Sequence, residues 1–481
     1  MVALKPTPIQ CNELPASGGA SQIAEFFEGK CIFVTGATGF IGKLLVEKLL
    51  RSCPGIKKIY LLVREKKGQH VQERVDHVLQ SKAFDYIREK NPQNLDKVVA
   101  VAGDLTLPNL GISFEDEQSL IRDVSVVFHS AATVKFDEPL KNAINMNVTG
   151  TLSVVNLSKK FHDLKAFVHV STAYCNCDRK VIEEKIYPTE HDPEKVVEMN
   201  SWLADDAMNN LSESLRGKKP NTYTYTKALT EALLGKVGAG MPIAIFRPTI
   251  VANAYNEPYP AWVDSANGCG GLMVAVANGV WRYSNTVPGA IADIVPADFC
   301  INAMISLAWN LANSTRTQEI GVYNFSCGKK ALSWEKAMGL VCTSARSDSC
   351  FETTLWYPSH SQYTDSRIFK LRTLLGEALP AYVIDVFLKV LGKRPMAKRL
   401  YEKIQRNAAE LQYFMNGTWE FKTMNVKELW HKLNREDKKT FGFDIEDLDV
   451  EKFVYSGLFG VRTYYLKNDP KTVASSHKRI Q

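Results

Sequence analysis

A tyrosine and a lysine four residues apart are the best candidates in this sequence for moving a proton. Tyr223 and Lys227 stand in NTYTYTKALTEALL, where the spacing of apolar residues predicts a helix. Residues four apart leave a helix on the same face. A lysine ammonium beside a phenol favours the phenolate and lowers its pKa towards neutrality, so the tyrosine could donate and accept a proton. We predict a catalytic pair; an ordinary surface helix is the alternative.

Two hydroxyl residues earlier in the chain offer hydrogen bonds to a substrate carbonyl. Ser171 and Thr172 end the apolar run AFVHVST, which is typical of a strand. They precede the tyrosine and follow a glycine-rich turn far upstream. This order strengthens the prediction, because a tyrosine and a lysine at this spacing are common by chance.

The glycine-rich turn is TGATGFIG, which lies between a β-branched run and a helical pattern. In that context Gly36 would allow a tight turn, Gly39 a close approach to a pyrophosphate, and Gly42 the packing of helix on sheet. The free N–H groups at the helix start would meet the phosphate charge. We predict a dinucleotide site, with a loop that binds no ligand as the alternative. The other residues of the turn that we assign to the cofactor are Thr35, Thr38, Phe40 and Ile41.

Arg64 follows the apolar run IYLLV, at the position where an acidic residue would bind the ribose 2′-hydroxyl of NAD. An arginine there suits a 2′-phosphate, so the predicted cofactor is NADPH; a solvated basic turn that includes Lys66 and Lys67 is the alternative. Asp104 ends the next run and could accept from the adenine amine. In HSAAT the small residues would let the backbone pass the cofactor, and we expect His129 to be structural. The remaining cofactor-binding assignments are Ala131, Ala132, Lys227 and Pro248.

Short apolar runs that alternate with amphipathic stretches would position these side chains. This alternation is typical of strand-helix-strand units and a parallel sheet. The predicted fold class is α/β, a Rossmann-like doubly wound parallel sheet followed by a helical C-terminal domain. The candidate strands are CIFVTG, IYLLV, VVAVAG, VSVVFHS, AFVHVST and PIAIFRP.

The character of the sequence changes near Pro358, where no further series of apolar strands follows. Residues 356–367 are the predicted hinge. Beyond it, Pro380 and Gly392 should begin and end a helix in which Asp385 and Lys389 stand four apart. The predicted divisions are a polar N-terminal tail (1–28), an NADPH-binding reductase domain (29–355), a helical domain (365–467) and a loose tail (468–481).

Composition limits the class of protein. A chain of 481 residues with 45% hydrophobic residues can form two or three globular domains. The net charge of +7 suits anionic small molecules or a membrane surface, and no signature of nucleic-acid binding accompanies it. The ten cysteines contain no CxxC pair, so we predict no metal site, and because we see no secretory signal segment we predict reduced thiols. We find no signal peptide and no run of ~18 apolar residues that would span a membrane.

Several strings in combination resemble the insect-type fatty acyl-CoA reductases, which are extended short-chain dehydrogenases/reductases with a C-terminal male-sterility domain. The resemblance runs from about Gly29 to Lys467. The strings of the first part are TGATGFIGKLLVEKLLRSCPGIKKIYLLVR, VVFHSAATVKFDEPL, HVSTAYCNCDR, NTYTYTKAL and IVPADF. Those of the second part are LPAYVIDVFLKVLGKRP, WEF and GVRTYYLK.

This resemblance implies NADPH-dependent reduction of a long-chain acyl-CoA to a primary alcohol, with two hydrides and an aldehyde between them. It implies that Tyr223 and Lys227 are catalytic and that Thr172, in preference to Ser171, orients the carbonyl. Asn147 in NMNVTGT matches an asparagine of the family, and a role in helix packing is equally open. The rival functions are a hydroxysteroid-type dehydrogenase, a sugar-nucleotide epimerase or dehydratase, and a non-catalytic dinucleotide sensor.

The sequence departs from the family pattern at two places. Many relatives have NGPTG where this chain has NGCGG from Asn267, and a histidine-bearing LFHxLPA where this chain has LGEALPA from Leu375. We expect both changes to alter the acyl tunnel.

A basic and apolar stretch of the helical domain suggests peripheral association with an anionic bilayer, with an ordinary basic helix face as the alternative. The expected location is the cytosolic face of the endoplasmic reticulum, a peroxisome or a lipid droplet. The basic residues are Lys389, Lys393, Arg394, Lys398, Arg399, Lys403 and Arg406, and the apolar ones are Tyr382, Ile384, Phe387 and Leu391.

Overall fold

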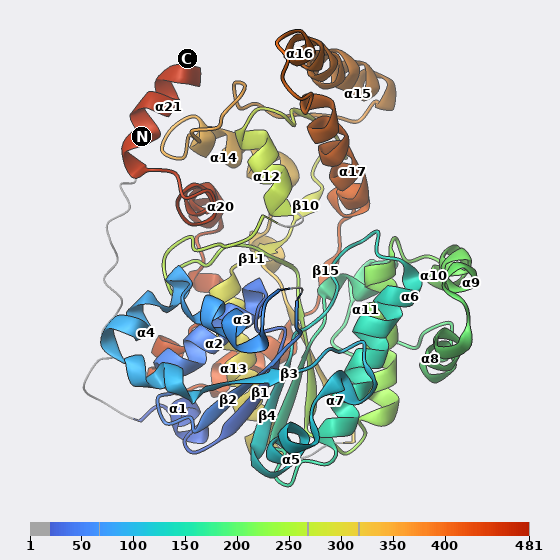
Figure 1. The fold of residues 1–481 in the computed structure, drawn as a ribbon, viewed down its shortest axis with the longest axis vertical. Helices are drawn as coiled ribbons and strands as arrows, with labels where there is room; N and C mark the ends of the chain where they lie inside the picture. Colours follow the sequence, from blue (N-terminus) through green and yellow to red (C-terminus); the bar gives the residue numbers. More distant parts are fainter. Residues whose placement is uncertain (1–19, 67, 267–268, 316–317, 481) are drawn as a thin grey trace.

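A parallel β-sheet forms the centre of the lower body of the protein (Figure 1). The computed structural model describes residues 20–66, 68–266, 269–315 and 318–480. Within these residues a seven-stranded sheet has the order β12-β7-β5-β4-β1-β2-β3, with all neighbours parallel. Its strands are β1 (Cys31–Thr35), β2 (Lys58–Val63), β3 (Val98–Ala102), β4 (Val124–His129), β5 (Ala166–Val170), β7 (Ile243–Pro248) and β12 (Gly321–Phe325).

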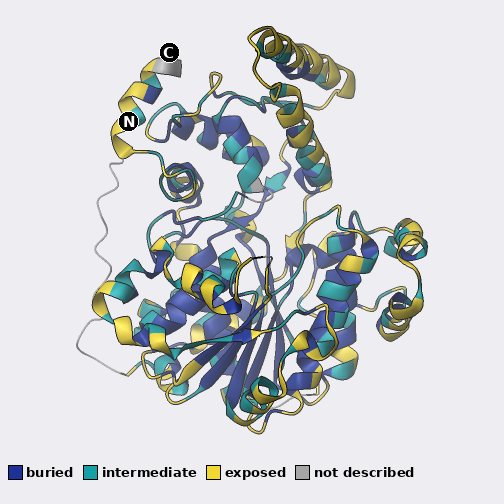
Figure 2. Cartoon of the chain, in the orientation of Figure 1, coloured by how far each residue is buried: buried dark blue, intermediate teal, exposed yellow. Residues whose placement is uncertain are grey.

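Helices cover both faces of this sheet, which confirms the doubly wound α/β fold (Figure 1). Alternate strand residues enter different cores: Ile32 and Val34 join one hydrophobic cluster, while Cys31 and Phe33 join another. Both faces are buried, so the strands contain continuous apolar runs (Figure 2). The first face carries α2 (Phe40–Ser52) and α13 (Ala297–Asn313), and the second carries α5 (Phe114–Asp123), α7 (Gly150–Ser158) and α11 (Thr222–Val237).

The six predicted strands are all present, and β12 is an additional edge strand that the sequence analysis missed. Its run GVYNF begins with glycine and includes the fully buried Asn324. The Asn324 carboxamide donates to the carbonyl oxygens of Ile182 at 3.1 Å and Lys422 at 2.8 Å. A polar residue can occupy this strand because tertiary contacts satisfy its hydrogen bonds.

An upper helical body lies above the carboxyl ends of the strands (Figure 1). It combines helices from both sides of the predicted domain boundary, since α14 precedes residue 355 yet packs on α20. The chain then returns to the lower body, where β15 pairs with β6 and α18 packs on α13. These elements are α12 (Cys269–Ala277), α14 (Trp334–Ala345), α17 (Ala397–Asn416), α18 (Met424–Lys432), α20 (Val450–Gly460), β6 (Val181–Ile182) and β15 (Glu420–Phe421).

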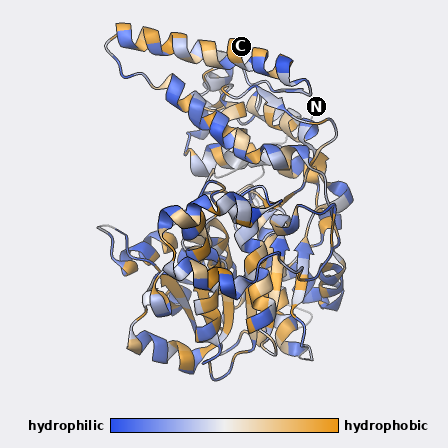
Figure 3. Ribbon diagram, turned by 90° about the vertical axis from the view of Figure 1, so that its right-hand side faces the viewer, coloured by the Kyte–Doolittle hydropathy of each residue, from blue (hydrophilic) through white to orange (hydrophobic). Residues whose placement is uncertain are grey.

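A long helix crosses the top of the upper body and is here called the apical helix (residues 366–390; Figure 3). It consists of α15 (Ser366–Thr373), a π-helical turn (Leu374–Ala378) and α16 (Leu379–Val390). Pro380 lies in the first turn of α16, and Gly392 follows its end with φ of 69°, as the sequence predicts. Asp385 does not pair with Lys389; its carboxylate accepts from three backbone N–H groups at the start of α17, at 2.8–3.0 Å.

Both predicted tails contain ordered structure in the described residues. In α1 (Gln22–Phe26) and just after it, Ile23 and Phe27 are fully buried. Ser21 donates to Asp437 at 2.6 Å, so folded structure begins ahead of residue 29. At the other end, α21 (Val473–Ile480) follows residue 468.

The remaining helices connect these elements or lie at the edge of the lower body. They are α3 (Val71–Leu79), α4 (Asp85–Lys90), α6 (Leu140–Ile144), α8 (Pro193–Trp202), α9 (Asp205–Asn210), α10 (Ser212–Arg216) and α19 (Arg435–Thr440). The short strands are β8 (Ile250–Val251), β9 (Tyr283–Asn285), β10 (Ile291–Ala292), β11 (Ile294–Val295), β13 (Leu332–Ser333) and β14 (Ser361–Tyr363).

Candidate active site

Tyr223 and Lys227 lie one turn apart at the start of α11. Asn221 caps this helix by accepting from the backbone N–H of Thr224 at 2.9 Å. Lys227 is buried, and its ammonium donates to the carbonyl oxygen of Val170 at 2.7 Å. Because Val170 is the last residue of β5, α11 holds the lysine at the carboxyl end of a central strand.

Of the two candidate hydroxyls after β5, Thr172 reaches Tyr223 and Ser171 does not. Thr172 lines the same cavity as Tyr223 and is hydrogen-bonded to the phenol. Its Oγ1 also accepts from the N–H of Tyr174 at 3.3 Å. The buried hydroxyl of Ser171 lies outside the cavity lining and has no hydrogen-bond partner among the described residues. Consecutive residues of an extended segment point in opposite directions, which explains the difference.

Burial determines the protonation states of the pair. It lowers the pKa of Lys227 to about 8, and Glu231 and Cys175 offset part of that effect. Burial raises the pKa of Tyr223; Cys175 adds to the rise, and the hydrogen bond from Thr172 opposes it. We expected Lys227 to lower the pKa of the tyrosine, but its ammonium is directed at the main chain of β5. The desolvated phenol therefore stays protonated at neutral pH and is a proton donor.

The glycine turn between β1 and α2 forms a cradle for a pyrophosphate. Gly36 has φ of 78°, and a Cβ there would lie 2.7 Å from the backbone nitrogen of Ala131. A Cβ on Gly42 would lie 2.3 Å from the carbonyl oxygen of Gly36. Helix α2 begins after Gly39 without a side-chain cap, so the N–H groups of its first turn are available to an anion. These residues fit a dinucleotide. Thr35, Thr38, Phe40 and Ile41 line the cavity with the three glycines.

The hydroxyl of Thr35 and the ring of His129 bond to each other inside the fold. His129 Nδ1 lies 2.7 Å from the Thr35 hydroxyl, and Nε2 lies 2.9 Å from the Thr151 hydroxyl. Burial, with a smaller effect from Lys227, lowers the pKa of His129 to about 3. The neutral ring therefore joins β1 to α7 and carries no charge to the site.

Two arginines meet at the end of β2. Arg64 lines the cavity and lies 3.7 Å from the carboxylate of Asp104. Arg74, on α3, lines the same cavity and donates to the carbonyl oxygen of Arg64. Asp104 also accepts from the backbone and hydroxyl of Thr106, at 2.9 and 2.8 Å. The sequence analysis missed Arg74, although a basic residue on the helix that follows Arg64 was an available signal. Lys67 lies outside the described residues.

The side chain of Asn147 forms hydrogen bonds with two segments of the lower body. Its Oδ1 accepts from the N–H of Thr133 at 2.9 Å, and its Nδ2 donates to Thr226 at 2.9 Å. The asparagine thereby holds the loop after β4 against α11. Two residues of that loop, Ala131 and Ala132, line the cavity beside the glycine turn.

One cavity of about 1380 Å3 joins the dinucleotide cradle to the upper body. Beside Tyr223, Thr249 and Ile250 line it, whereas Pro248 ends β7 and does not. In the upper body, α12, α14, α20 and the turn after α20 contribute an apolar part of its wall, whereas α17 contributes mainly charged and polar side chains. The side chains of that apolar part are Met273, Val341, Leu458 and Val461.

Helix α17 brings the C-terminal part of the chain to the candidate active site. The ring of Phe136 stacks on Tyr223 with centroids 5.9 Å apart, and Phe414 of α17 packs on Phe136 at 5.4 Å. Tyr413 and Trp419 both donate to the carbonyl oxygen of Cys177, at 3.0 and 2.8 Å. These bonds fasten the end of α17 to the loop after β5.

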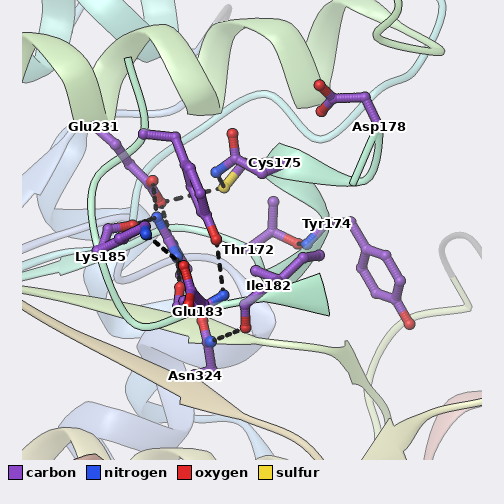
Figure 4. A network of polar contacts seen from close by, with 12 residues as sticks. Thr172, Tyr174, Cys175, Asp178, Ile182, Glu183, Lys185, Glu231 and Asn324 are labelled. Carbon is purple, nitrogen blue, oxygen red and sulfur yellow. Dashed lines mark hydrogen bonds and ion pairs between the residues drawn. The ribbon is translucent and has the colours of Figure 1, made fainter. Parts of the chain in front are cut away.

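A buried ion pair involves Glu231, one turn after Lys227 on α11; Figure 4 shows Glu231 and Cys175 in this network. Glu231 forms two hydrogen bonds with the guanidinium of Arg247, at 2.8 and 2.5 Å, and accepts from the thiol of Cys175 at 3.3 Å. Arg247 also donates to the carbonyl oxygens of Glu183 and Lys185, at 3.1 and 2.9 Å. The sequence analysis missed this pair; an isolated glutamate in the apolar part of a helix was the only signal.

Comparisons with known proteins agree with this arrangement. Two family models, both described as male sterility protein, match residues 34–304 and 377–468. Fatty acyl-CoA reductase 1 of Mus musculus is 37% identical over 460 residues, which cover 95% of this chain and 89% of the relative. The chain belongs to the fatty acyl-CoA reductase family. Fatty acyl-CoA reductase 2 of Bos taurus is 36% identical, with 96% of this chain and 89% of the relative covered.

Solved structures share the fold of the reductase at low sequence identity. The terminal R domain of the myxalamid PKS-NRPS pathway has a TM-score of 0.59 at 19% identity, with coverage of 94% of this chain and 93% of that one. The R domain of a nonribosomal peptide synthetase from Mycobacterium tuberculosis has a TM-score of 0.60 at 19% identity, with 92% and 94% covered. At these identities the likeness concerns the fold.

The two departures from the family pattern have different locations in the reductase. Asn267 and Gly268 lie outside the described residues, although Gly270 just after them lines the cavity. Glu377, in the second departure, lies away from the cavity lining. Its carboxylate accepts from the N–H of Arg282 at 2.6 Å and from Gln405 at 2.8 Å, so it fixes the apical helix to the upper body.

Proposed function

We propose that this protein uses NADPH to reduce a long-chain acyl-CoA to a primary alcohol through an aldehyde. The proposal rests on the cavity described above. This one cavity contains the dinucleotide cradle, the hydroxyls of Tyr223 and Thr172, and an apolar wall. A dinucleotide alone would not require the apolar wall, and a long acyl chain would. The names of the relatives, fatty acyl-CoA reductase 1 and 2, support the same substrate class.

Tyr223 and Thr172 are the proposed donors to the thioester carbonyl. NADPH, when bound, supplies the hydride for each of the two reductions. In the first, the two hydroxyls stabilise the negative charge that develops on the carbonyl oxygen. Collapse of the tetrahedral adduct then restores the C=O bond and breaks the C–S bond, so that CoA leaves as a thiolate that takes a proton from solvent, and the aldehyde stays against the apolar wall.

In the second reduction Tyr223 gives its proton to the alkoxide. Because its pKa is raised, the phenol keeps this proton until negative charge develops on the substrate oxygen. Lys227 has a pKa of about 8, so at neutral pH most molecules carry an ammonium there. This ammonium, held on the carbonyl oxygen of Val170, is the proposed source of the proton that returns to the phenolate.

Incubation of the purified protein with NADPH and acyl-CoAs of several chain lengths tests the proposal. We expect two NADPH to be oxidised for each acyl-CoA, with a primary alcohol as the product identified by mass spectrometry. Accumulation of aldehyde alone would contradict the second reduction. Tight NADPH binding without turnover would contradict the enzymatic function.

The proposed preference for NADPH is supported by Arg64 and Arg74, which both line one end of the cavity. Arg64→Glu should weaken NADPH binding by about 10- to 100-fold and change NADH binding much less, because a charged contact becomes a repulsion. Fluorescence titration with both cofactors measures this. Arg122→Glu is the control, since Arg122 is an exposed arginine that also pairs with a carboxylate. Equal losses for NADPH and NADH would remove the basis of the cofactor assignment.

The apical helix supports peripheral membrane association. It presents an exposed apolar stripe to solvent, and Lys370, Arg372 and Lys389 lie on the same helix (Figure 3). An apolar stripe with basic neighbours fits the interface of an anionic bilayer. Among the described residues, no helix is long and apolar enough to cross a membrane. The stripe consists of Leu371, Leu375, Leu379, Val383, Val386 and Val390.

Binding to liposomes of mixed neutral and anionic lipid tests this surface. Val386→Glu/Val390→Glu should abolish sedimentation with the liposomes, because each charge must enter the interface with the helix. Trp202→Glu changes an equally exposed apolar residue on α8 and should sediment like the wild type. Sedimentation of the double variant at the wild-type level would refute this surface. The proposed location stays the cytosolic face of the endoplasmic reticulum, a peroxisome or a lipid droplet.

A further inference from the structure

Five of the seven basic residues between 389 and 406 fall into two groups in the structure. Lys389 and Lys393 lie on the apical helix and in the turn that follows it. Arg399, Lys403 and Arg406 instead line the cavity that contains the candidate active site. Their spacing of four and three residues places them on one face of α17. The cations that the sequence suggested for a single lipid surface therefore belong to two surfaces.

The three cations on α17, here called the cation row, have no ion-pair partner in the described part of the chain. Glu402 beside them lies 3.6 Å from Lys398. Glu410 and Asp137 also line the cavity, near the stacked rings of Phe136 and Phe414. Burial raises the pKa of Glu410, Asp137 adds to the rise and Arg406 opposes it. Cations one turn apart repel each other, so the free row favours a bound polyanion.

The phosphates of the dinucleotide belong elsewhere in the same cavity. The 2′-phosphate is assigned to the end of β2, and the pyrophosphate to the start of α2 after β1. Helix α17 is fastened to Cys177, after β5. In the sheet, at about 4.8 Å per strand, the end of β5 lies roughly 14 Å from the end of β2 and roughly 10 Å from the end of β1. These assignments leave the cation row free for a second polyanion.

The order of side chains along α17 matches the order of groups in an acyl-CoA. After the cation row come Asn407, Leu411 and Phe414, all in the cavity wall. A helix rises about 1.5 Å per residue, so Lys403 and Phe414 stand roughly 16 Å apart. In CoA an extended arm with two amide groups separates the phosphates from the thioester sulfur. The carboxamide of Asn407 can bond to such an amide, and the apolar residues after it lead towards Tyr223.

We propose that the cation row binds the phosphate groups of the CoA part of the substrate while Tyr223 acts on the thioester. This rests on the proposed function and assigns a part of the substrate to α17. Arg399 and Arg406 bring planar guanidinium forks that bind phosphate oxygens in pairs, and Lys403 adds a point charge between them. The row thereby sets the position of the thioester and distinguishes the first reduction from the second.

The two reductions provide the test, since an aldehyde carries no CoA. For Arg399→Glu/Lys403→Glu, the KM for a long-chain acyl-CoA should rise at least about tenfold, while kcat/KM for the aldehyde of the same chain length stays within about twofold. Lys195→Glu/Lys427→Glu makes the same change of charge on exposed helix residues outside the cavity and should leave both unchanged. Wild-type enzyme should bind the acyl thioester of 3′-dephospho-CoA more weakly than the acyl-CoA of the same chain length. The α17 variant should bind these two thioesters equally well.

Three outcomes would overturn the proposal. An unchanged KM for acyl-CoA would show that the row does not bind the substrate. Equal losses for acyl-CoA and aldehyde would show that the substitutions damage the fold of the cavity. Unchanged kinetics together with lost sedimentation on anionic liposomes would assign the row to lipid headgroups. A wild-type enzyme that reduces aldehyde but no acyl-CoA would instead contradict the proposed function itself.

Discussion

Tyr223→Phe should lower kcat for acyl-CoA and for aldehyde by about 10²- to 10⁴-fold and leave NADPH affinity within about twofold. The ring of Phe would keep the stack on Phe136, while the hydroxyl that bonds Thr172 and donates the proton would be lost. Steady-state turnover with product analysis measures the first effect, and fluorescence titration with NADPH measures the second.

Tyr225→Phe provides a matched control on the same helix. Tyr225 is buried two residues further on, in the cluster behind α11, and its hydroxyl has no hydrogen-bond partner among the described residues. Turnover by this variant should equal that of the wild type. If Tyr223→Phe also retained wild-type turnover, the proton would have to come from another group and the proposed mechanism would fail.

Glu231→Ala should reduce the free energy of unfolding by about 3–5 kcal/mol. The substitution would leave the guanidinium of Arg247 in the interior without its carboxylate, and this side chain is fully buried. Two carbonyl bonds to the loop at 183–185 would remain, but they do not neutralise the charge. Thermal and denaturant unfolding measure the loss.

The exposed pair between Lys336 and Glu451 is the control for this prediction. Glu451→Ala should cost less than about 1 kcal/mol, because water screens both charges. Glu231→Leu/Arg247→Met removes both charges and should recover much of the lost stability, since an apolar pair of similar volume needs no neutralisation. Equal stability of Glu231→Ala and Glu451→Ala would contradict the role of the buried pair.

Local patterns in the sequence were sufficient for the frame of the site. Six strands, the glycine turn and the helix that carries Tyr223 and Lys227 depend on neighbours within a few residues, so their periodicity and turn chemistry can be read directly. The sequence analysis missed the strand β12 because the hydrogen bonds of its buried Asn324 are made with residues far away in the chain. Arg74 was missed although it is only ten residues from Arg64, because the packing of α3 beside β2 decides which basic residue of that helix meets Arg64.

Electrostatic predictions from spacing alone were less reliable than predictions of shape. Asp385 and Lys389 stand four apart on a helix, yet the carboxylate caps the next helix, where three N–H groups compete successfully for it. Lys227 stands one turn from Tyr223, yet burial decides the pKa values of both groups. Spacing tells which side chains share a face, and desolvation and competing partners decide which of them interact.

The sequence by itself determined the parallel sheet, the dinucleotide turn, the tyrosine-lysine pair and the family. Each of these is encoded in contiguous residues, where backbone geometry limits what a pattern can form. Only the tertiary structure decided that Phe414 of α17 packs on Phe136 and that part of the basic stretch lines the cavity while part lies on the apical helix. These features depend on how the upper helical body packs on the carboxyl ends of the strands, and contacts between residues so distant in the chain leave no periodic signal in it.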